Sequence, residues 1–474
     1  MDLIQPFSSI RSIVHRKRLR AILAVVIVVC VVGMLSLADL PSAILFDASS
    51  SNGSSNGDVT STTILRLLPS APPAHLDQDA HLGTKDRVTP SYTAFLEARQ
   101  SKTLEEAVSK YRLKYDREPP QHFDNFVSFA LNHKCLVDEY DQIHRDLAPF
   151  RKMNATVFKR RVRALLNNDA VSTYSVKNGV VEISQTTYLN SAWDPLIAKL
   201  APDLPDVDVT VNALDEPRVL LNNVRNIMNT EDFNDIHGLL IAPDSVSYTY
   251  DLYPVLSQTK IHPCFSDIIV PPIFYASVSP SVIDNVPWEQ KESKLFWRGS
   301  TSGGHAVDGN WRQMHRQRFM LLARNRSDTD VGFTHIIQCD QADCESQQKE
   351  FSTVPSEPWE EHIKHKWLFD TDGNSFSGRF TRLLRSKSLV FKATIMTEYF
   401  SDWLKPYIHY VPISLSYDDL DAKLKWAAEN DELAKSIAEE GSRMSTRYLR
   451  PQDMECYTLH LLTELAHLQH QPDP

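Results

Sequence analysis

Outside its first twenty residues, the sequence lacks any block of basic residues interleaved with aromatic ones. Its 50 Lys and Arg are outnumbered by 60 Asp and Glu, which gives a net charge of -10. A protein that binds nucleic acid needs a basic footprint, so nucleic acid is not an expected partner. The sequence also lacks internal repeats. Its 474 residues, 42% of them hydrophobic, can form a core and two or three domains, which excludes a chain disordered throughout.

Cysteine is scarce, with six residues in the whole chain. Cys30 lies in an apolar run, and the five others cannot all pair within one chain. Cys339 and Cys344 lie in the string C-D-Q-A-D-C, where a small disulfide loop is favoured because zinc would need two more soft ligands nearby. The pairing of the remaining three, Cys135, Cys264 and Cys456, is left open.

One long uncharged apolar run, residues 21–38, approaches the ~20 residues that a helix needs to cross a bilayer. Basic residues precede it and acidic residues follow it, so we expect residues 1–20 in the cytosol and the large C-terminal part in the lumen. The alternative is a cleaved signal peptide, but the run is too long and no clean A-x-A site follows. We therefore expect a single-pass type II anchor, in the Golgi or ER membrane. Sequons at Asn52, Asn154 and Asn325 agree with a lumenal location.

Residues 39–90 include a low-complexity stretch and predict a flexible stem. A capping box at Thr103 and Glu106 marks the start of the folded region and predicts a helix toward Tyr115. Beyond it, strand-like and helical segments alternate, which is typical of parallel sheets wrapped by helices. The expected strands are residues 180–183, 207–211, 239–241 and 267–270, and then 295–297, 334–337, 367–369, 389–391 and 407–411.

The alternation predicts an α/β fold with two Rossmann-like domains facing a cleft, over residues 91–275 and 276–445. Helices are expected at residues 192–200, 218–228 and 311–324. Residues 418–469 are helical by pattern, with Gly441 and Pro451 as interruptions, and residues 446–474 form a C-terminal helical segment.

Residues 367–413 carry the strongest functional signal. A strand over 367–369 runs into a loop of Asp, Gly, Asn and Ser, a helix opens near Arg379, and another strand follows. Small residues before a helix let backbone N–H groups face an anion, and the helix dipole with Arg379 and Arg382 favours negative charge. The expected ligand is a nucleotide diphosphate.

A second strand, residues 295–297, also breaks into a turn rich in Gly and Ser ahead of a basic helix. Ser300 and Thr301 can donate hydrogen bonds to phosphate. The candidates to neutralise its charge are Arg298, Arg312, Arg316 and Arg318. Either loop alone could be a plain turn, but two in one half of a chain favour phosphate binding.

Several strings resemble glycosyltransferase family 90, which contains fungal capsule-associated transferases and animal protein O-glucosyltransferases. They are N-A-L-D-E-P-R-V at 212–219, W-R-G-S-T at 297–301, S-G-R-F at 377–380, S-L-V-F-K at 388–392 and L-K-P-Y-I-H-Y-V-P at 404–412. The string Y-D-R-E-P-P-Q-H-F-D at 115–124 looks like the fungal branch. The resemblance extends from about Tyr115 to Cys456, leaving out the anchor and stem.

The resemblance implies a GT-B-like fold and an inverting transfer from a UDP-sugar, with no cofactor and no essential metal. By position, Asp215 matches the catalytic base, and Ser300, beside Arg298, matches the serine that binds uridine diphosphate. The diphosphate loop corresponds to Asn374, Ser375, Phe376, Ser377, Gly378 and Arg379. A second diphosphate arginine falls on Arg316, with Arg318 and Arg312 as alternatives because residues 303–311 look like an insertion.

The donor is expected to be UDP-xylose or UDP-glucose, and the acceptor a glycan, glycolipid or protein. The fungal-looking strings favour xylosyl transfer to a cell-surface glycan. Two alternatives stay open: a metal-dependent GT-A enzyme using one of two D-x-D strings, and a catalytically silent carbohydrate-binding protein. The D-x-D strings are at 206–208 and 370–372, and both are interpreted as non-ligating. His362 and His365 are interpreted as a solvated helix face, and His409, Tyr410 and Trp403 as packing residues.

Overall fold

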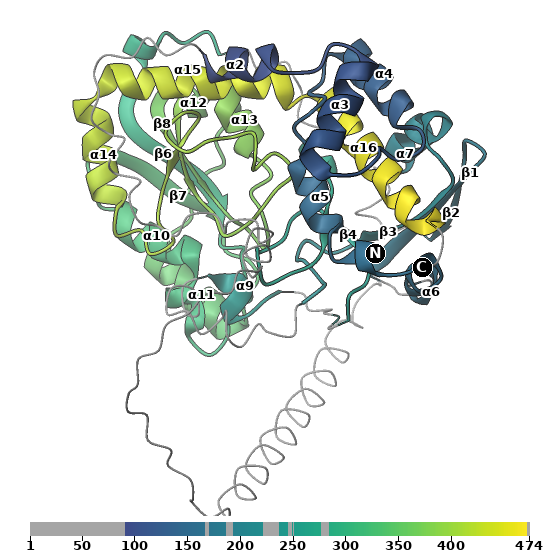
Figure 1. Ribbon diagram of the computed structural model, residues 1–474. Coiled ribbons are helices and arrows are strands. Elements are labelled where there is room, and N and C mark those ends of the chain that lie inside the picture. The colour runs from purple at the N-terminus through teal and green to yellow at the C-terminus, as the bar shows by residue number, and fades with distance from the viewer. Residues whose placement is uncertain are drawn as a thin grey trace, which may run out of the picture. The chain divides into compact units, whose positions relative to one another are not determined.

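Two five-stranded sheets organise the chain (Figure 1). The computed structural model describes residues 91–165, 170–185, 193–220, 237–244, 249, 251–275 and 284–471. The predicted tail, anchor and stem (residues 1–20, 21–38 and 39–90) lie outside these ranges. Among the helices that are described, none combines the length and the apolar character needed to cross a membrane. The prediction of an anchor at residues 21–38 therefore stays a prediction.

The first sheet has the order β2-β1-β3-β4-β5 and is mixed. β3, β4 and β5 pair in parallel, as expected, but β1 is antiparallel to both β2 and β3. Asn178 and Gly179 have φ of +50° and +76°, which is typical of a two-residue hairpin turn. The prediction of an all-parallel first sheet was therefore wrong for β1 and β2. The strands are β1 (Val171–Lys177), β2 (Val180–Gln185), β3 (Val207–Asn212), β4 (Leu256–Ser257) and β5 (Ile268–Ile269).

The second sheet has the order β10-β9-β8-β6-β7, and every pairing in it is parallel. Its central strands are buried on both faces, which explains their continuous apolar sequence. The predicted strands are confirmed, although β7 begins earlier than expected and β10 covers only the end of residues 407–411. The strands are β6 (Glu292–Ser300), β7 (Thr329–His335), β8 (His365–Thr371), β9 (Leu389–Ala393) and β10 (Val411–Pro412).

Helices lie between or after the strands of the second sheet along the chain, with α13 and α15 packed against β9 and α10 against β7. They are α10 (His315–Ala323), α11 (Gln341–Phe351), α12 (Trp359–His362), α13 (Phe380–Arg385), α14 (Leu420–Glu429) and α15 (Asp431–Tyr448). Short 3-10 turns occur at Phe150–Lys152, Ala201–Asp203, Ile273–Tyr275, Trp288–Gln290 and Asn310–Gln313.

The helices of the first half surround its sheet. Thr103 caps the second of them, accepting a hydrogen bond from Glu106 N as predicted. Residues 239–241, which we expected as a strand, instead form the short helix α9. The helices are α2 (Tyr92–Ala98), α3 (Leu104–Tyr115), α4 (Phe123–His133), α5 (Asp141–Leu147), α6 (Ala155–Ala164), α7 (Trp193–Leu200) and α9 (Gly238–Ile241).

The last helix, α16 (Pro451–His470), packs with the first half of the chain, against α4, α6 and β3 (Figure 1). Gln469 pairs with the backbone N–H and C=O of Asp208 in β3, at 3.0 and 2.7 Å. A disulfide joins Cys456 of α16 to Cys135 after α4. The end of the chain therefore completes the core around the first sheet.

The second disulfide, Cys339–Cys344, is the predicted one. Cys264 is a free, buried thiol. Gly441 was expected to interrupt a helix, and this was wrong, because α15 runs through it. A Cβ on Gly441 would stand 2.4 Å from the carbonyl oxygen of His409, so the glycine permits close packing and does not end the helix.

Candidate active site

Both predicted phosphate loops lie at one edge of the second sheet. β6 and β8 are parallel neighbours, and they end at Ser300 and Thr371. The chain leaves β6 toward β7 on one side and then returns to β8 on the other side. The carboxyl ends of β6 and β8 therefore flank a topological switch point, the place where open α/β sheets bind ligands.

The turn after β6 depends on two glycines. Gly303 and Gly304 have φ of +115° and +119°, which side chains rarely adopt. A Cβ on Gly303 would lie 2.5 Å from the His315 ring, and one on Gly304 would lie 2.8 Å from Gly238 O in α9. The turn is thus pressed between the start of α10 and a helix from the first half of the chain.

Two arginines come together at this edge. Arg316 donates to Asp372 O at 2.7 Å, Ser300 O at 3.1 Å and Ser302 Oγ at 2.7 Å. Arg379 donates to Arg298 O. The guanidinium carbons of Arg316 and Arg379 each lie 5.9 Å from the Trp297 ring centroid. Within the described ranges, no carboxylate is within ion-pair distance of either guanidinium group.

The electrostatics of this pair favour an anion. Burial, reinforced by the charge of Arg379, lowers the pKa of Arg316 to about 9. Burial also lowers the pKa of Arg379. Two cations held together in a low dielectric are stabilised by a ligand with negative charge, such as a diphosphate.

Both carboxylates of the D-x-D string at the end of β8 accept hydrogen bonds from donors within the protein. Asp370 accepts from Ser377 Oγ at 2.5 Å and from Lys392 Nζ at 2.9 Å. Asp372 accepts from Thr394 Oγ1 at 2.6 Å and from Ile395 N at 2.9 Å. These carboxylates fix the loop that follows β8, in agreement with their interpretation as loop residues.

Asp215 lies in the turn after β3, at the end of the first sheet. The side chain of Asn212 shapes this turn by accepting from Leu214 N at 3.0 Å and donating to Glu216 O at 2.8 Å. The side chain of Asn374, in the loop after β8, lies close enough to the Asp215 carboxyl to lower its pKa. The predicted base from one half of the chain therefore meets the predicted diphosphate loop from the other half.

The environment of Asp215 suits a proton acceptor. Burial raises the pKa of its carboxyl group, the side chain of Asn374 lowers it, and the nearby charge of Asp244 raises it. The net direction is upward. A carboxylate with a raised pKa is a stronger base than one exposed to water.

The other residues of the loop after β8 serve different contacts. Ser375 O accepts from Gly373 N at 2.8 Å, which closes the loop, and Ser377 Oγ binds Asp370. Phe376 is buried against Tyr275, with ring centroids 5.6 Å apart. Gly378 is exposed.

Three predicted arginines lie outside this cluster. Arg298 pairs with Asp330 at 2.7 Å. Arg312 stacks over Trp311 and pairs with Glu350 at 3.3 Å, while Arg318 donates to Leu415 O and Ser416 O. Of the three candidates for the second diphosphate arginine, Arg316 is the one that reaches Ser300 and Ser302.

Sequence reasoning missed a histidine pair beneath the loops. His237 and His315 stack with ring centroids 4.0 Å apart, and both are buried. His315 accepts from Gly238 N at 3.2 Å and donates from Nε2 to Asp372 O at 2.8 Å. The signal available was weak, because each histidine stands alone in the sequence and their contact joins residues 78 positions apart in the chain.

The other residues considered as metal ligands, in the D-x-D string at 206–208 and at His365, make contacts within the fold. Asp206 accepts from Asn178 N at 2.8 Å and Asp208 from Ser175 Oγ at 2.7 Å, both at the hairpin of the first sheet. His365 was expected on a solvated helix face, which was wrong. It lies in β8, it is buried, and it stacks on Phe296.

The interpretation of His409 and Trp403 as packing residues is confirmed. Both are buried. His409 Nδ1 accepts from Lys405 N at 2.8 Å, and Trp403 Nε1 donates to Glu139 O at 2.6 Å.

A buried cluster of His144, His460 and Glu464 has the side-chain types of a metal site. Arg117 lies 2.7 Å from His144 Nδ1, and an arginine can only donate, so His144 must carry its proton on Nε2. Glu464 already accepts from Tyr111 OH at 2.5 Å and pairs with Arg117 and Arg151. This network holds α16 to the N-terminal helices, and its protonation pattern does not fit a metal.

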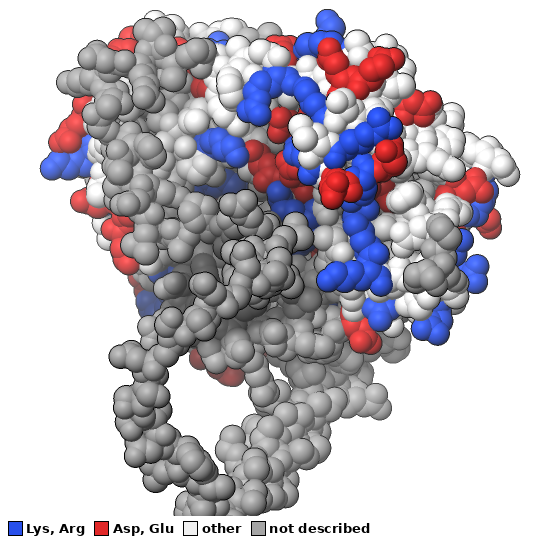
Figure 2. All heavy atoms as spheres, viewed as in Figure 1, with Lys and Arg blue, Asp and Glu red and all other residues white. Residues whose placement is uncertain are grey.

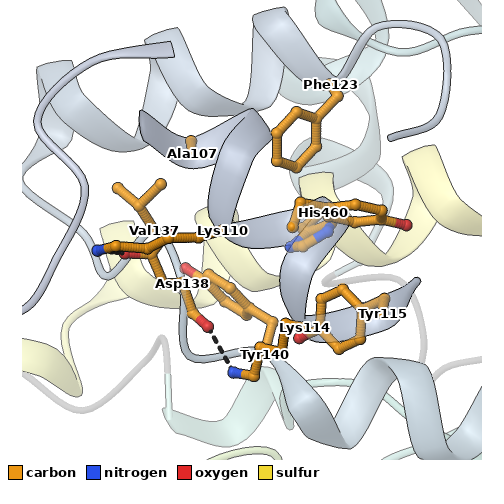
Figure 3. A pocket seen from close by; sticks show the side chains of 10 residues that line it. Ala107, Lys110, Lys114, Tyr115, Phe123, Val137, Asp138, Tyr140 and His460 are labelled. Carbon is orange, nitrogen blue, oxygen red and sulfur yellow. Dashed lines mark hydrogen bonds and ion pairs between the residues drawn. The ribbon is translucent and has the colours of Figure 1, made fainter. Parts of the chain in front are cut away.

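The pocket beside His460 is lined mainly by side chains of α3 and α4 and of the segment after α4 (Figure 3). Its space of about 20 Å³ holds roughly one water molecule. Lys110 and Lys114 close it by binding the side chain and the backbone of Asp138, both at 2.8 Å. It is too small for a sugar. On the described part of the face in Figure 2, acidic and basic side chains are intermingled.

The fold and site define a class: an α/β protein in which two arginines lie at a topological switch point and a turn of a second sheet brings a carboxylate to the same edge. Residues 273–473 match the family model described as Glycosyl transferase family 90. The chain is 28% identical to the O-glucosyltransferase rumi homolog of Aedes aegypti over 284 residues (56% of this chain, 63% of that protein). It is 27% identical to Protein O-glucosyltransferase 3 of Homo sapiens over 360 residues (74% and 65%).

Protein O-glucosyltransferase 1 of Rattus norvegicus is 26% identical over 346 residues, covering 68% of this chain and 78% of that protein. The chain spans just under two thirds of the length of the mosquito and human relatives. The resemblance to glycosyltransferase family 90 read from the motifs is confirmed over residues 273–473, where the family model matches.

Proposed function

We propose that the chain is a glycosyltransferase that moves a sugar from a UDP-sugar to an acceptor hydroxyl with inversion, and that its two sheets form a GT-B-like enzyme. One observation carries the proposal: Asp215 meets the Asn374 loop at the sheet edge where Arg316 and Arg379 lie, and neither arginine pairs with a carboxylate of the described residues.

In this proposal the acceptor oxygen attacks the anomeric carbon from the face opposite UDP. The acceptor proton passes to the Asp215 carboxylate, the bond from the sugar to the diphosphate breaks, and UDP leaves with the electron pair. One base is sufficient for an inverting transfer. Arg316 and Arg379 stabilise the charge that develops on the diphosphate, a role that a metal ion fills in other transferases.

The names of the relatives favour glucose as the sugar and a protein as the acceptor. UDP-xylose and a glycan acceptor, which the fungal-looking strings favour, remain the alternatives. We further propose that residues 21–38 anchor the chain as a type II protein of the Golgi or ER membrane. The two disulfides support a lumenal location for the folded part.

The test is a donor screen with the purified full-length chain. UDP release is measured with UDP-glucose, UDP-xylose and other UDP-sugars, each with EDTA and with added Mn²⁺. We expect turnover with one of the first two sugars and no loss in EDTA. Activity that disappears in EDTA and returns with Mn²⁺ would support the GT-A alternative. Failure of UDP to raise the melting temperature would support a silent binding protein.

A further inference from the structure

We propose that Glu398 is a positioning residue for Arg379: its protonated carboxyl group donates a hydrogen bond to Tyr275, and Tyr275 in turn donates to the backbone turn that carries Arg379. The inference rests on the proposed function, because that function assigns Arg379 to the diphosphate of the donor. Neither Glu398 nor Tyr275 belongs to the strings that resemble the family.

The turn that carries Arg379 is closed by the carbonyl group of Ser377. This oxygen accepts from Phe380 N at 3.3 Å, so Arg379 lies inside the turn. The same oxygen lies 3.1 Å from the hydroxyl group of Tyr275, which belongs to the 3-10 turn Ile273–Tyr275 in the first half of the chain. A carbonyl oxygen can only accept, so the Tyr275 hydroxyl is the donor in this contact.

The Tyr275 hydroxyl has a second partner. Glu398 Oε2 lies 2.5 Å from it, and both side chains are buried. A hydroxyl group has one hydrogen, so it cannot donate to Ser377 O and to Glu398 at the same time. Both contacts are satisfied when the Glu398 carboxyl group is protonated and donates to the Tyr275 oxygen. The chain of hydrogen bonds then runs from Glu398 through Tyr275 to Ser377 O.

The charges around Glu398 favour its protonated form. Lys392 Nζ lies 2.9 Å from Asp370 and 3.6 Å from Glu398 Oε1, so Asp370 is its closer partner. Among the described residues, Lys392 is the only cation within ion-pair distance of Glu398. Because Lys392 already neutralises Asp370, an ionised Glu398 would add a second buried charge without a cation of its own.

Glu398 titrates in an experimentally accessible range. Burial raises its pKa to about 7, with Lys392 and the hydrogen bond from Tyr275 acting to lower it and Asp370 and Asp372 acting to raise it. Below this pH the chain of hydrogen bonds is complete. Above it the carboxylate accepts the hydroxyl hydrogen of Tyr275, and the carbonyl group of the turn loses its donor. Burial raises the pKa of the surrounding phenols, which therefore keep their protons: Tyr275, Tyr399 and Tyr410.

The test is the affinity of the full-length chain for UDP, measured by isothermal titration calorimetry at about pH 6 and about pH 8.5. Glu398→Gln is the conservative variant, because its amide can donate to Tyr275 at either pH. Tyr275→Phe removes the chain of hydrogen bonds at either pH. Glu118→Gln makes the same chemical change in an exposed ion pair with Arg112 and is the control. The terminal phosphate of UDP also titrates at about pH 6, and this contribution is common to all four proteins.

Relative to Glu398→Gln, wild type and Glu118→Gln should lose about fivefold in UDP affinity between the lower and the higher pH, the size of one neutral hydrogen bond. Glu398→Gln should bind UDP like wild type at the lower pH. Tyr275→Phe should bind about fivefold more weakly at that pH and change with pH as Glu398→Gln does. The same change with pH in wild type and in Glu398→Gln would overturn the inference.

A second measurement separates this inference from the proposed function. An acid whose pKa is raised in the folded state destabilises the fold as the pH rises from its unfolded pKa toward its folded pKa. The melting temperature of Glu398→Gln minus that of wild type should therefore increase between about pH 4.5 and about pH 7.5, whether or not the protein binds UDP. A constant difference would contradict a protonated Glu398. Wild type that binds UDP at neither pH would refute the proposed function, while the melting temperatures would still decide the protonation of Glu398.

Discussion

Replacing Arg316 by methionine separates the effect of this arginine on the stability of the unliganded protein from its contribution to UDP binding. Burial and the charge of Arg379 lower the pKa of Arg316 to about 9, which means that the fold disfavours the Arg316 charge by several kcal/mol. The same guanidinium donates three hydrogen bonds, to Asp372 O, Ser300 O and Ser302 Oγ. At about 1 to 1.5 kcal/mol each, these offset most of that cost. We therefore expect Arg316→Met to change the free energy of unfolding without ligand by no more than about 2 kcal/mol.

The same substitution removes a charge-assisted contact to the diphosphate worth about 1.5 to 3 kcal/mol, which weakens UDP binding about 10- to 150-fold. At a UDP concentration of about 100 times the wild-type Kd, bound UDP stabilises wild type by about 2.7 kcal/mol and the variant by about 0.3 to 1.4 kcal/mol. The assay is melting of the full-length chain with and without UDP. Arg312→Met, an exposed arginine stacked on Trp311, is the control. Equal stabilisation of Arg316→Met and wild type by UDP would refute the reasoning.

Three further predictions concern stability. Asp215→Asn should melt higher than wild type at pH 7 and equal to it below pH 3.8, because an acid with a raised pKa penalises the fold once the unfolded chain has ionised; a lower melting temperature at pH 7 would contradict this. Gly441→Ala should lower the melting temperature although alanine favours helices, because its Cβ meets the carbonyl of His409, and a rise would show that the contact relaxes. Loss of the Cys135–Cys456 disulfide, which spans 321 residues, should cost up to about 5 kcal/mol in denaturant unfolding of a double serine variant, and no change would refute the loop-closure argument.

The second sheet could be predicted because its signals are local. Each central strand is a short apolar run, and the loops after Ser300 and Thr371 are rich in Gly, Ser and Asn. The motifs in those loops indicated the resemblance to glycosyltransferase family 90, and that resemblance implied the role of Asp215. That Asp215 lies against Asn374 could not be read from spacing, because the contact joins two sheets.

The rest of the fold depends on contacts between distant residues. α16 packs on β3 through Gln469 and Asp208, and nothing in the pattern of the last helix identifies that partner. The short helix α9 has the composition of a strand, and its helical form comes with its packing against Gly303 and Gly304. The stacked pair of histidines could not be predicted for the same reason, since neither ring is part of a motif.

The central claim is that Asp215 takes the acceptor proton in a UDP-sugar transfer. The most direct measurement is UDP release by the purified full-length wild type, Asp215→Asn and Asp206→Asn, with UDP-glucose or UDP-xylose and an acceptor. Asp206 serves as the control because its carboxylate binds the hairpin of the first sheet. The account predicts turnover by wild type and Asp206→Asn, and a loss of at least about 100-fold in Asp215→Asn, within the range that general base catalysis contributes. Full activity in Asp215→Asn would contradict it.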